Sequence, residues 1–220
     1  FSRDGRSLLL TRRNGNRAKG HCIVETAGWT MTHEDVDPDE IPALLGGTRS
    51  LRLAPQHVYS PDGRTLLRRI RQQAGKRVWT LNRSGERHEL PGAFSGSREA
   101  VWHPDGRWFA VTTRGDPPGI AICDGHTGET LTEVAQPATV FTVDIHPDGS
   151  RLVTGSEDGV VRVYDTERFG LITELNGHTS YIFSARFSPD GTRLATGSGD
   201  GTVRIWDTVP RSVRRSGDGP

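Results

Sequence analysis

The sequence predicts an all-β chain, a β-propeller of four-stranded antiparallel blades, from one repeated turn, its spacing and the glycine content. The turn is Asp-Gly between short alternating runs, and its five copies place aspartates at Asp4, Asp62, Asp105, Asp148 and Asp190. These aspartates lie 58, 43, 43 and 42 residues apart, and a period of about 40–45 residues is typical of a propeller blade. Glycine accounts for 27 of the 220 residues, which suits many short strands joined by tight turns.

The last copy of the repeat shows why each turn joins two strands. In "SPDG" (188–191), proline presets φ, aspartate can bond its own backbone, and glycine takes the left-handed conformation that closes a hairpin. Alternating residues precede the turn over 182–187, and "RLATGS" (193–198) and "TVRIWD" (202–207) flank a second Asp-Gly turn. We therefore predict three consecutive antiparallel strands, a, b and c, and we expect 168–178 to supply the outer strand d of the blade before it.

Sheets of this size cannot bury both faces alone, so neighbouring sheets must stack around an axis. In the last blade we expect Phe187, Leu194, Val203 and Ile205 to supply the apolar contact between blades.

Two copies carry further motifs. The last one, "LNGHTSYIFSARFSPDGTRLATGSGDGTVRIWDT", resembles a WD40 repeat, with "GH", "SPDG" and "WD" in order. The fourth, "VAQPATVFTVDIHPDGSRLVTGSEDGVVRVYDT", is similar but has Gln136 and Tyr164 in place of histidine and tryptophan. The resemblance is strong over 137–208 and weaker over 1–136. It implies a WD40-like propeller with about five blades, the first and last incomplete.

The repeat also predicts where the blades divide. We expect boundaries near 1–48, 49–92, 93–135, 136–176 and 177–208, followed by a flexible tail over 209–220. The last blade has no strand d in the sequence, and the chain starts at Phe1, near the end of a strand a. In the family that the repeats resemble, an N-terminal strand often completes the final blade. We therefore expect the chain to be the C-terminal part of a longer protein, and the predominance of arginine over lysine indicates a GC-rich, bacterial type of genome.

The resemblance implies a hydrogen-bonded tetrad in the best-formed blade, made by His178, Thr196, Asp200 and Trp206. The fourth blade carries Gln136, Thr154, Asp158 and Tyr164 at these positions, which predicts a partial network. A hydroxyl, a histidine and an aspartate also match a hydrolase triad, which needs an exposed nucleophile and an oxyanion hole. Because Thr196 falls in the middle of a predicted strand, opposite the tryptophan, we interpret the set as structural.

The resemblance further implies a non-catalytic scaffold that binds other proteins or peptides through its d–a and b–c loops. The matching candidates here are Ser180, Tyr181, Glu157 and Arg114. An alternative is a propeller accessory to a hydrolase, peptidase or signalling enzyme domain lying upstream in the chain, because "SPDG" turns also mark the propellers of peptidases. A third option is the binding of an anionic ligand or nucleic acid by the basic second blade.

The second blade is strongly basic. Residues 49–87 carry ten arginines and lysines against two acidic residues, and such asymmetry can steer an anionic partner. Arg69 and Arg71 should share one strand face, with Arg68 on the other. These arginines are either solvated side chains covering apolar surface or a docking patch for phosphate or an acidic peptide. Aromatic residues are sparse nearby, which disfavours nucleic acid.

Composition argues against several other classes. Two cysteines make no disulfide framework, so we expect a reducing, cytoplasmic compartment, and no apolar run is long enough to cross a membrane. Asp35, Asp37 and Asp39 match three ligand positions of a calcium loop, but Glu40 replaces the glycine that such a loop requires. We expect a solvated acidic loop there, and neither a metal nor a cofactor.

Overall fold

The structure is a computed structural model in which every regular element is a β-strand. It describes residues 7–14, 17–25, 30–33, 57–71, 77–83, 86–90, 94 and 96–208, with the backbone alone up to His57 and at Arg71 and Arg77. The described strands form five antiparallel sheets that follow one another along the chain. The fold is therefore the all-β series of propeller blades that the repeat predicts.

The first two sheets lie in the N-terminal half. The first contains β1 (Ser7–Asn14), β2 (Arg17–Glu25) and β3 (Thr30–His33). The second contains β4 (His57–Tyr59), β5 (Thr65–Arg71), β6 (Arg77–Arg83) and β7 (Glu86–Glu89).

Three further sheets complete the series. The third contains β8 (Ala100–Trp102), β9 (Trp108–Thr113), β10 (Gly119–Asp124) and β11 (Thr130–Ala135). The fourth contains β12 (Val140–Ile145), β13 (Arg151–Ser156), β14 (Val161–Asp165) and β15 (Leu171–Leu175). The fifth contains β16 (Ile182–Phe187), β17 (Arg193–Ser198) and β18 (Val203–Asp207).

The predicted turns join strands a and b in the last four sheets. In the last two, Asp148 accepts a hydrogen bond from the Ser150 amide at 2.8 Å and Asp190 one from the Thr192 amide at 3.0 Å. Gly149 and Gly191 close these turns at φ 80° and 71°, in the left-handed region that glycine tolerates. The turn chemistry expected from "PDG" is confirmed.

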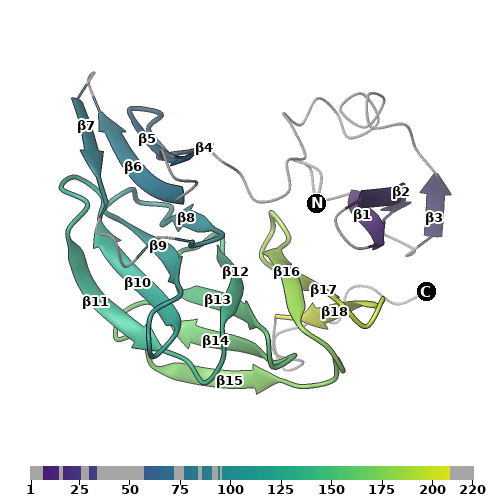
Figure 1. Cartoon of the computed structure of the whole chain (residues 1–220). Coiled ribbons are helices and arrows are strands. Elements are labelled where there is room, and N and C mark those ends of the chain that lie inside the picture. Colours follow the sequence, from purple (N-terminus) through teal and green to yellow (C-terminus); the bar gives the residue numbers. More distant parts are fainter. Residues whose placement is uncertain are drawn as a thin grey trace, which may run out of the picture.

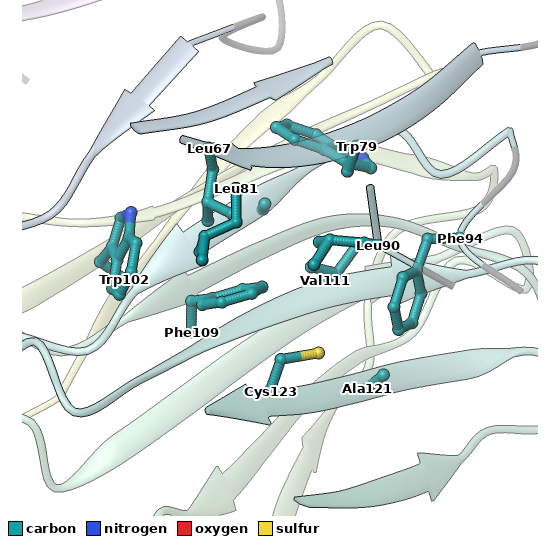
Figure 2. Packing of buried hydrophobic residues seen from close by; sticks show 11 residues of the cluster. Leu67, Trp79, Leu81, Leu90, Phe94, Trp102, Phe109, Val111, Ala121 and Cys123 are labelled. Carbon is teal, nitrogen blue, oxygen red and sulfur yellow. The ribbon is translucent and has the colours of Figure 1, made fainter. Parts of the chain in front are cut away.

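The second to fifth sheets succeed one another as an arc, with strand a of each sheet on the inner side (Figure 1). Strand β8 contacts β4, β12 contacts β8, and β16 contacts β12. Apolar clusters fill the spaces between these sheets. The cluster in Figure 2 joins the second and third sheets and includes Leu67, Trp79, Phe109 and Cys123, each completely buried.

Histidines of the "HPDG" turns connect successive sheets at the end where strand a meets strand b. His103 Nε2 donates to the Gly149 carbonyl at 3.0 Å, and His146 Nε2 donates to the Gly191 carbonyl at 2.9 Å. A Cβ atom on Gly191 would lie 2.4 Å from His146 Nε2, so the histidine ring occupies the space that a side chain would need. The same turn residue thus closes its own hairpin and contacts the next blade.

The expected contact residues of the last blade divide into two pairs. Phe187 and Leu194 are buried in the cluster between the fourth and fifth sheets. The prediction is wrong for Val203, which is 42% exposed, and for Ile205, which is only partly buried. Both lie on β18, whose outer edge pairs with no strand in the described part of the chain. Among the described residues, no helix has the length and apolar character that crossing a membrane requires.

Candidate functional site

The four predicted tetrad residues are joined by hydrogen bonds in the fifth sheet. Trp206 Nε1 donates to Thr196 Oγ1 at 2.9 Å, and Thr196 Oγ1 lies 2.9 Å from His178 Nε2. His178 Nδ1 lies 2.9 Å from Asp200 Oδ2. With the histidine proton on Nδ1, each donor faces an acceptor along the whole series. The series runs from strand c through strand b and the loop before strand a to Asp200 in the b–c turn.

Asp200 is held in its ionised form. Burial alone would raise the pKa of its carboxyl, but hydrogen bonds from Thr202, from the Thr179 amide and from His178 outweigh it and hold the pKa well below its ordinary value. Hydrogen bonds to an ionised carboxylate are stronger than those to a neutral acceptor, and they favour the ionised form in turn. Asp200 thus ties the b–c turn to the d–a loop.

The position of the Thr196 hydroxyl argues against reading these residues as a hydrolase triad. Thr196 is only 1% exposed, and its hydroxyl lies between the Trp206 indole and the His178 ring. A nucleophile must reach a substrate carbonyl beside an oxyanion hole. A buried hydroxyl with two neighbours in hydrogen-bond contact does not meet this requirement.

The corresponding positions of the fourth sheet are connected differently. Gln136 Nε2 donates to Thr154 Oγ1 at 2.9 Å, and the Ser156 hydroxyl donates to Gln136 Oε1 at 3.0 Å. Asp158 instead binds Arg162, whose guanidinium also binds Glu174 on strand d, both at 2.8 Å. In the fifth sheet the second ring nitrogen of His178 reaches the aspartate. Gln136 has no such nitrogen to reach Asp158, so the network of the fourth sheet divides in two.

Tyr164 occupies the tryptophan position of the fourth sheet and is 5% exposed. Burial raises the pKa of its phenol, and a hydrogen bond with the side chain of Thr154 lowers this pKa by a smaller amount. Tyr164 therefore adjoins the Gln136–Thr154 part of the divided network.

The loop candidates lie together at the b–c and d–a end of the blades. Arg114 and Glu157 line one open depression between the third and fourth sheets, together with Phe141. The Glu157 amide donates to the Thr139 carbonyl at 2.9 Å, which ties the b–c turn to the d–a loop of the same blade. Two candidates that the sequence places 43 residues apart thus share one surface.

Ser180 and Tyr181 continue this surface onto the fifth sheet. The Ser180 carbonyl accepts a hydrogen bond from Ser198 at 2.9 Å, which fixes the loop before β16. Tyr181 is 46% exposed, and its ring lies edge-on to Phe141 with 5.9 Å between the ring centres. We define the loop-end surface as Arg98, Arg114, Phe141, Glu157 and Tyr181.

Sequence reasoning missed two members of the loop-end surface, Arg98 and Phe141. The Arg98 guanidinium carbon lies 4.2 Å from the centre of the Phe141 ring, a cation–π contact between the third and fourth sheets. Arg98 lies in a d–a loop, a position that the family resemblance marks for the contact face, whereas Phe141 lies in strand β12, just after such a loop. Their pairing follows from the packing of two blades, which no local motif encodes.

The second-blade arginines have different surroundings. Arg68 is exposed, whereas Arg69 donates to the Arg98 carbonyl at 2.8 Å and lies over the Trp79 ring at 6.0 Å. The guanidinium of Arg69 therefore holds the d–a loop that carries Arg98. The side chain of Arg71 lies outside the described residues.

A charged cluster between the third, fourth and fifth sheets was also missed. Arg186 on β16 binds Glu99, whose other oxygen accepts a hydrogen bond from the Val143 amide at 3.0 Å. Asp144 on β12 accepts from the Phe187 amide at 2.8 Å. Burial raises the pKa of Asp144 to about 6, although Arg186 opposes this shift. Glu99 and Arg186 lie 87 residues apart, so their contact exists only after the blades stack.

Within the described ranges, no three His, Cys, Asp or Glu side chains lie close enough together to hold a metal ion. Asp35, Asp37 and Asp39 lie outside the described residues. Cys123 is buried, and burial raises the pKa of its thiol to about 12. This thiol is therefore protonated at neutral pH and unsuited to bind a metal or act as a nucleophile.

Successive antiparallel sheets of three or four strands, joined by Asp-Gly turns, define the fold as a series of β-propeller blades, and the fifth blade holds a buried His–Asp tetrad. Residues 120–165 and 169–207 match the WD40 family, described as WD domain, G-beta repeat. The chain thus carries two WD40 repeats, which span strands β10 to β14 and β15 to β18.

Proteins of known name are similar to slightly less than half of this chain. The serine-threonine kinase receptor-associated protein of Dictyostelium discoideum is 35% identical over 104 residues, which are 46% of this chain and 35% of that protein. The human protein of the same name is 42% identical over 105 residues, 46% of this chain and 29% of that protein. The matched residues thus span about a third of the length of these relatives.

Proposed function

We propose that the chain is a non-catalytic protein–protein interaction scaffold that binds other proteins through its loop-end surface. The observation that carries the proposal is that side chains from three blades meet on one exposed surface. Arg114 comes from the third blade, Glu157 and Phe141 come from the fourth, and Tyr181 comes from the loop that enters the fifth. Arginine and tyrosine are enriched at the centres of protein interfaces. The similar proteins are named receptor-associated, and this name also supports a role in binding other proteins.

The tetrad favours a scaffold over an enzyme. Thr196, His178 and Asp200 are the residues nearest to a catalytic triad, and their hydrogen bonds fix the loop before β16. Holding a loop in one conformation reduces the entropy that is lost when a partner binds to it. We infer that the tetrad serves binding by ordering the d–a loop that carries Tyr181.

Affinity capture from a lysate of the native host tests this function. The full chain is compared with Tyr181→Ala and Glu157→Arg, and with Arg168→Ala as a matched control. Arg168 is exposed at the opposite end, in the turn after β14. The proposal predicts partners that are lost with both loop-end variants and kept with the control. Equal capture by all four proteins would contradict it.

A further inference from the structure

The loop-end surface contains two arginines that are close to each other. Arg98 and Arg114 line the same depression, and both are exposed. Burial and the nearby charge of Arg114 lower the pKa of Arg98. Among the described residues, neither guanidinium has a carboxylate within ion-pair distance. Two adjacent guanidinium groups without an ion-pair partner favour an anionic ligand.

Two acidic residues restrict the charge of that ligand. Glu157 and Asp116 line the same depression as Arg98 and Arg114, so the formal charges of its walls balance. A dianionic phosphate would meet repulsion from both carboxylates, whereas a carboxylate carries a single charge. The planar guanidinium fork also matches a carboxylate with two parallel hydrogen bonds.

A row of aromatic rings adjoins the arginines. Phe141 lies beneath Arg98 and against Tyr181, whose ring centre is 6.3 Å from that of Phe183. Tyr181 and Phe183 are 46% and 40% exposed. Exposed neighbouring aromatic rings offer an apolar surface on which a second aromatic or large apolar side chain can pack.

We propose that the loop-end surface binds a short peptide segment that carries a carboxylate side chain close to an aromatic or large apolar side chain. The carboxylate lies between Arg98 and Arg114, and the apolar side chain packs against Tyr181 and Phe183. This inference rests on the proposed scaffold function and adds the chemistry of the partner. An unphosphorylated acidic segment of another protein is the occupant that the charge balance favours.

Selection from a displayed library of random peptides, with the full chain as the target, tests the inference. It predicts enrichment of peptides in which aspartate or glutamate lies within a few residues of an aromatic or large apolar residue. The best synthetic peptide is then measured by fluorescence anisotropy, beside versions with glutamine or phosphoserine replacing the acidic residue. Both replacements should weaken binding, glutamine by at least about tenfold because a charge-assisted hydrogen-bond pair is lost.

The protein variants separate this site from other surfaces. Arg98→Gln and Arg114→Gln should each weaken binding of the acidic peptide by about tenfold or more. Arg168→Gln at the opposite end should leave the affinity unchanged. All three side chains are exposed, so equal circular dichroism spectra are expected, and only Arg98→Gln, which loses the cation–π contact with Phe141, should lower the melting temperature slightly.

Several results would overturn the inference: no enriched peptide, enriched peptides without an acidic residue, tighter binding of the phosphoserine peptide, or unchanged binding by both arginine variants. If affinity capture still depends on Tyr181 and Glu157 in that case, the scaffold function stands and only the peptide chemistry is wrong. If capture is also independent of these residues, the proposed function fails as well.

Discussion

Val161 and Val203 occupy the same position in strand c of consecutive blades, yet Val161 is completely buried and Val203 is 42% exposed. The arginines that follow these valines differ in the same way. Arg162 is buried between Asp158 of the b–c turn and Glu174 of strand d, whereas Arg204 is exposed. In the described chain, strand β15 pairs with β14, and no strand pairs with the outer edge of β18. Burial in this fold therefore depends on the neighbouring strand and blade as much as on the residue itself.

This difference predicts unequal effects of one substitution at the two positions. Val161→Thr keeps the side-chain shape but buries a hydroxyl, so it should lower the free energy of unfolding by about 1–3 kcal/mol. Val203→Thr exposes the hydroxyl to water and should change the free energy of unfolding by less than about 0.5 kcal/mol. Urea denaturation of the two variants measures both values. Equal losses would show that strand β18 is covered in solution.

The tetrad predicts energetic coupling between Thr196 and Trp206. Thr196→Val and Trp206→Phe each break the 2.9 Å hydrogen bond from the indole to the hydroxyl. Each should cost about 1 kcal/mol or more, because a partly buried donor or acceptor loses its partner. The double variant should cost less than the sum of the two, by about 0.5 kcal/mol or more. Strict additivity in a double-mutant cycle would exclude the bond as a stabilising contact.

Asp144 predicts a dependence of stability on pH. Its pKa of about 6 in the folded chain lies above its ordinary value of 3.8, so the folded state binds a proton more tightly than the unfolded state. Stability should therefore rise as the pH falls from 7 to 4, by at most about 3 kcal/mol. Arg186 and Glu99 face Asp144: the charge of Arg186 lowers the pKa of Asp144 and opposes this gain, whereas the charge of Glu99 raises the pKa and adds to it.

The matched control for this prediction is Asp148. Hydrogen bonds, first from the Ser150 hydroxyl, lower the pKa of Asp148 to about 2. Its stabilising effect is therefore present above pH 3.8 and is lost as the pH falls through about 2. Asp144→Asn should remove the rise between pH 7 and 4, and Asp148→Asn should preserve it. Denaturant titrations at several pH values decide between these outcomes.

The histidine contacts between blades predict a local effect. His146→Leu removes the hydrogen bond to the Gly191 carbonyl but keeps an apolar side chain of similar size. The free energy of unfolding should fall by about 1 kcal/mol. Hydrogen exchange should quicken in the turn 188–192 and in the adjacent ends of β16 and β17. Faster exchange confined to the second sheet would contradict a contact between blades at this position.

The strands of the last blade could be predicted from the sequence almost to the residue. The expected strands 182–187 and 193–198 coincide with β16 and β17, because Asp-Gly turns fix both the hairpin and the alternation of side chains. The tetrad residues could be named because the last copy resembles a WD40 repeat closely enough for each tetrad position of that family to be matched within it. Val203 was misjudged because its burial depends on a neighbouring strand, which its own sequence does not encode.

Contacts between blades could not be predicted in the same way. Arg98 meets Phe141, and Arg186 meets Glu99, across sheet interfaces that exist only after the blades have stacked. The divided network of the fourth blade has a local cause that the sequence did contain. Gln136 replaces the histidine that reaches the aspartate in the fifth blade, so Asp158 pairs with Arg162 instead. Arg204 follows Asp200 at the same distance of four residues, yet the tetrad there is intact, so the glutamine and not the arginine is the signal.

Site-specific photo-crosslinking tests most directly whether the loop end is the face that binds other proteins. A benzophenone side chain is placed in the full chain at Tyr181 or, for comparison, at Arg168, and each protein is irradiated in a lysate of the native host. The scaffold interpretation predicts discrete crosslinked proteins from position 181 that disappear with Glu157→Arg, and no such products from position 168. Crosslinks of equal yield from both positions, or from position 168 alone, would contradict it.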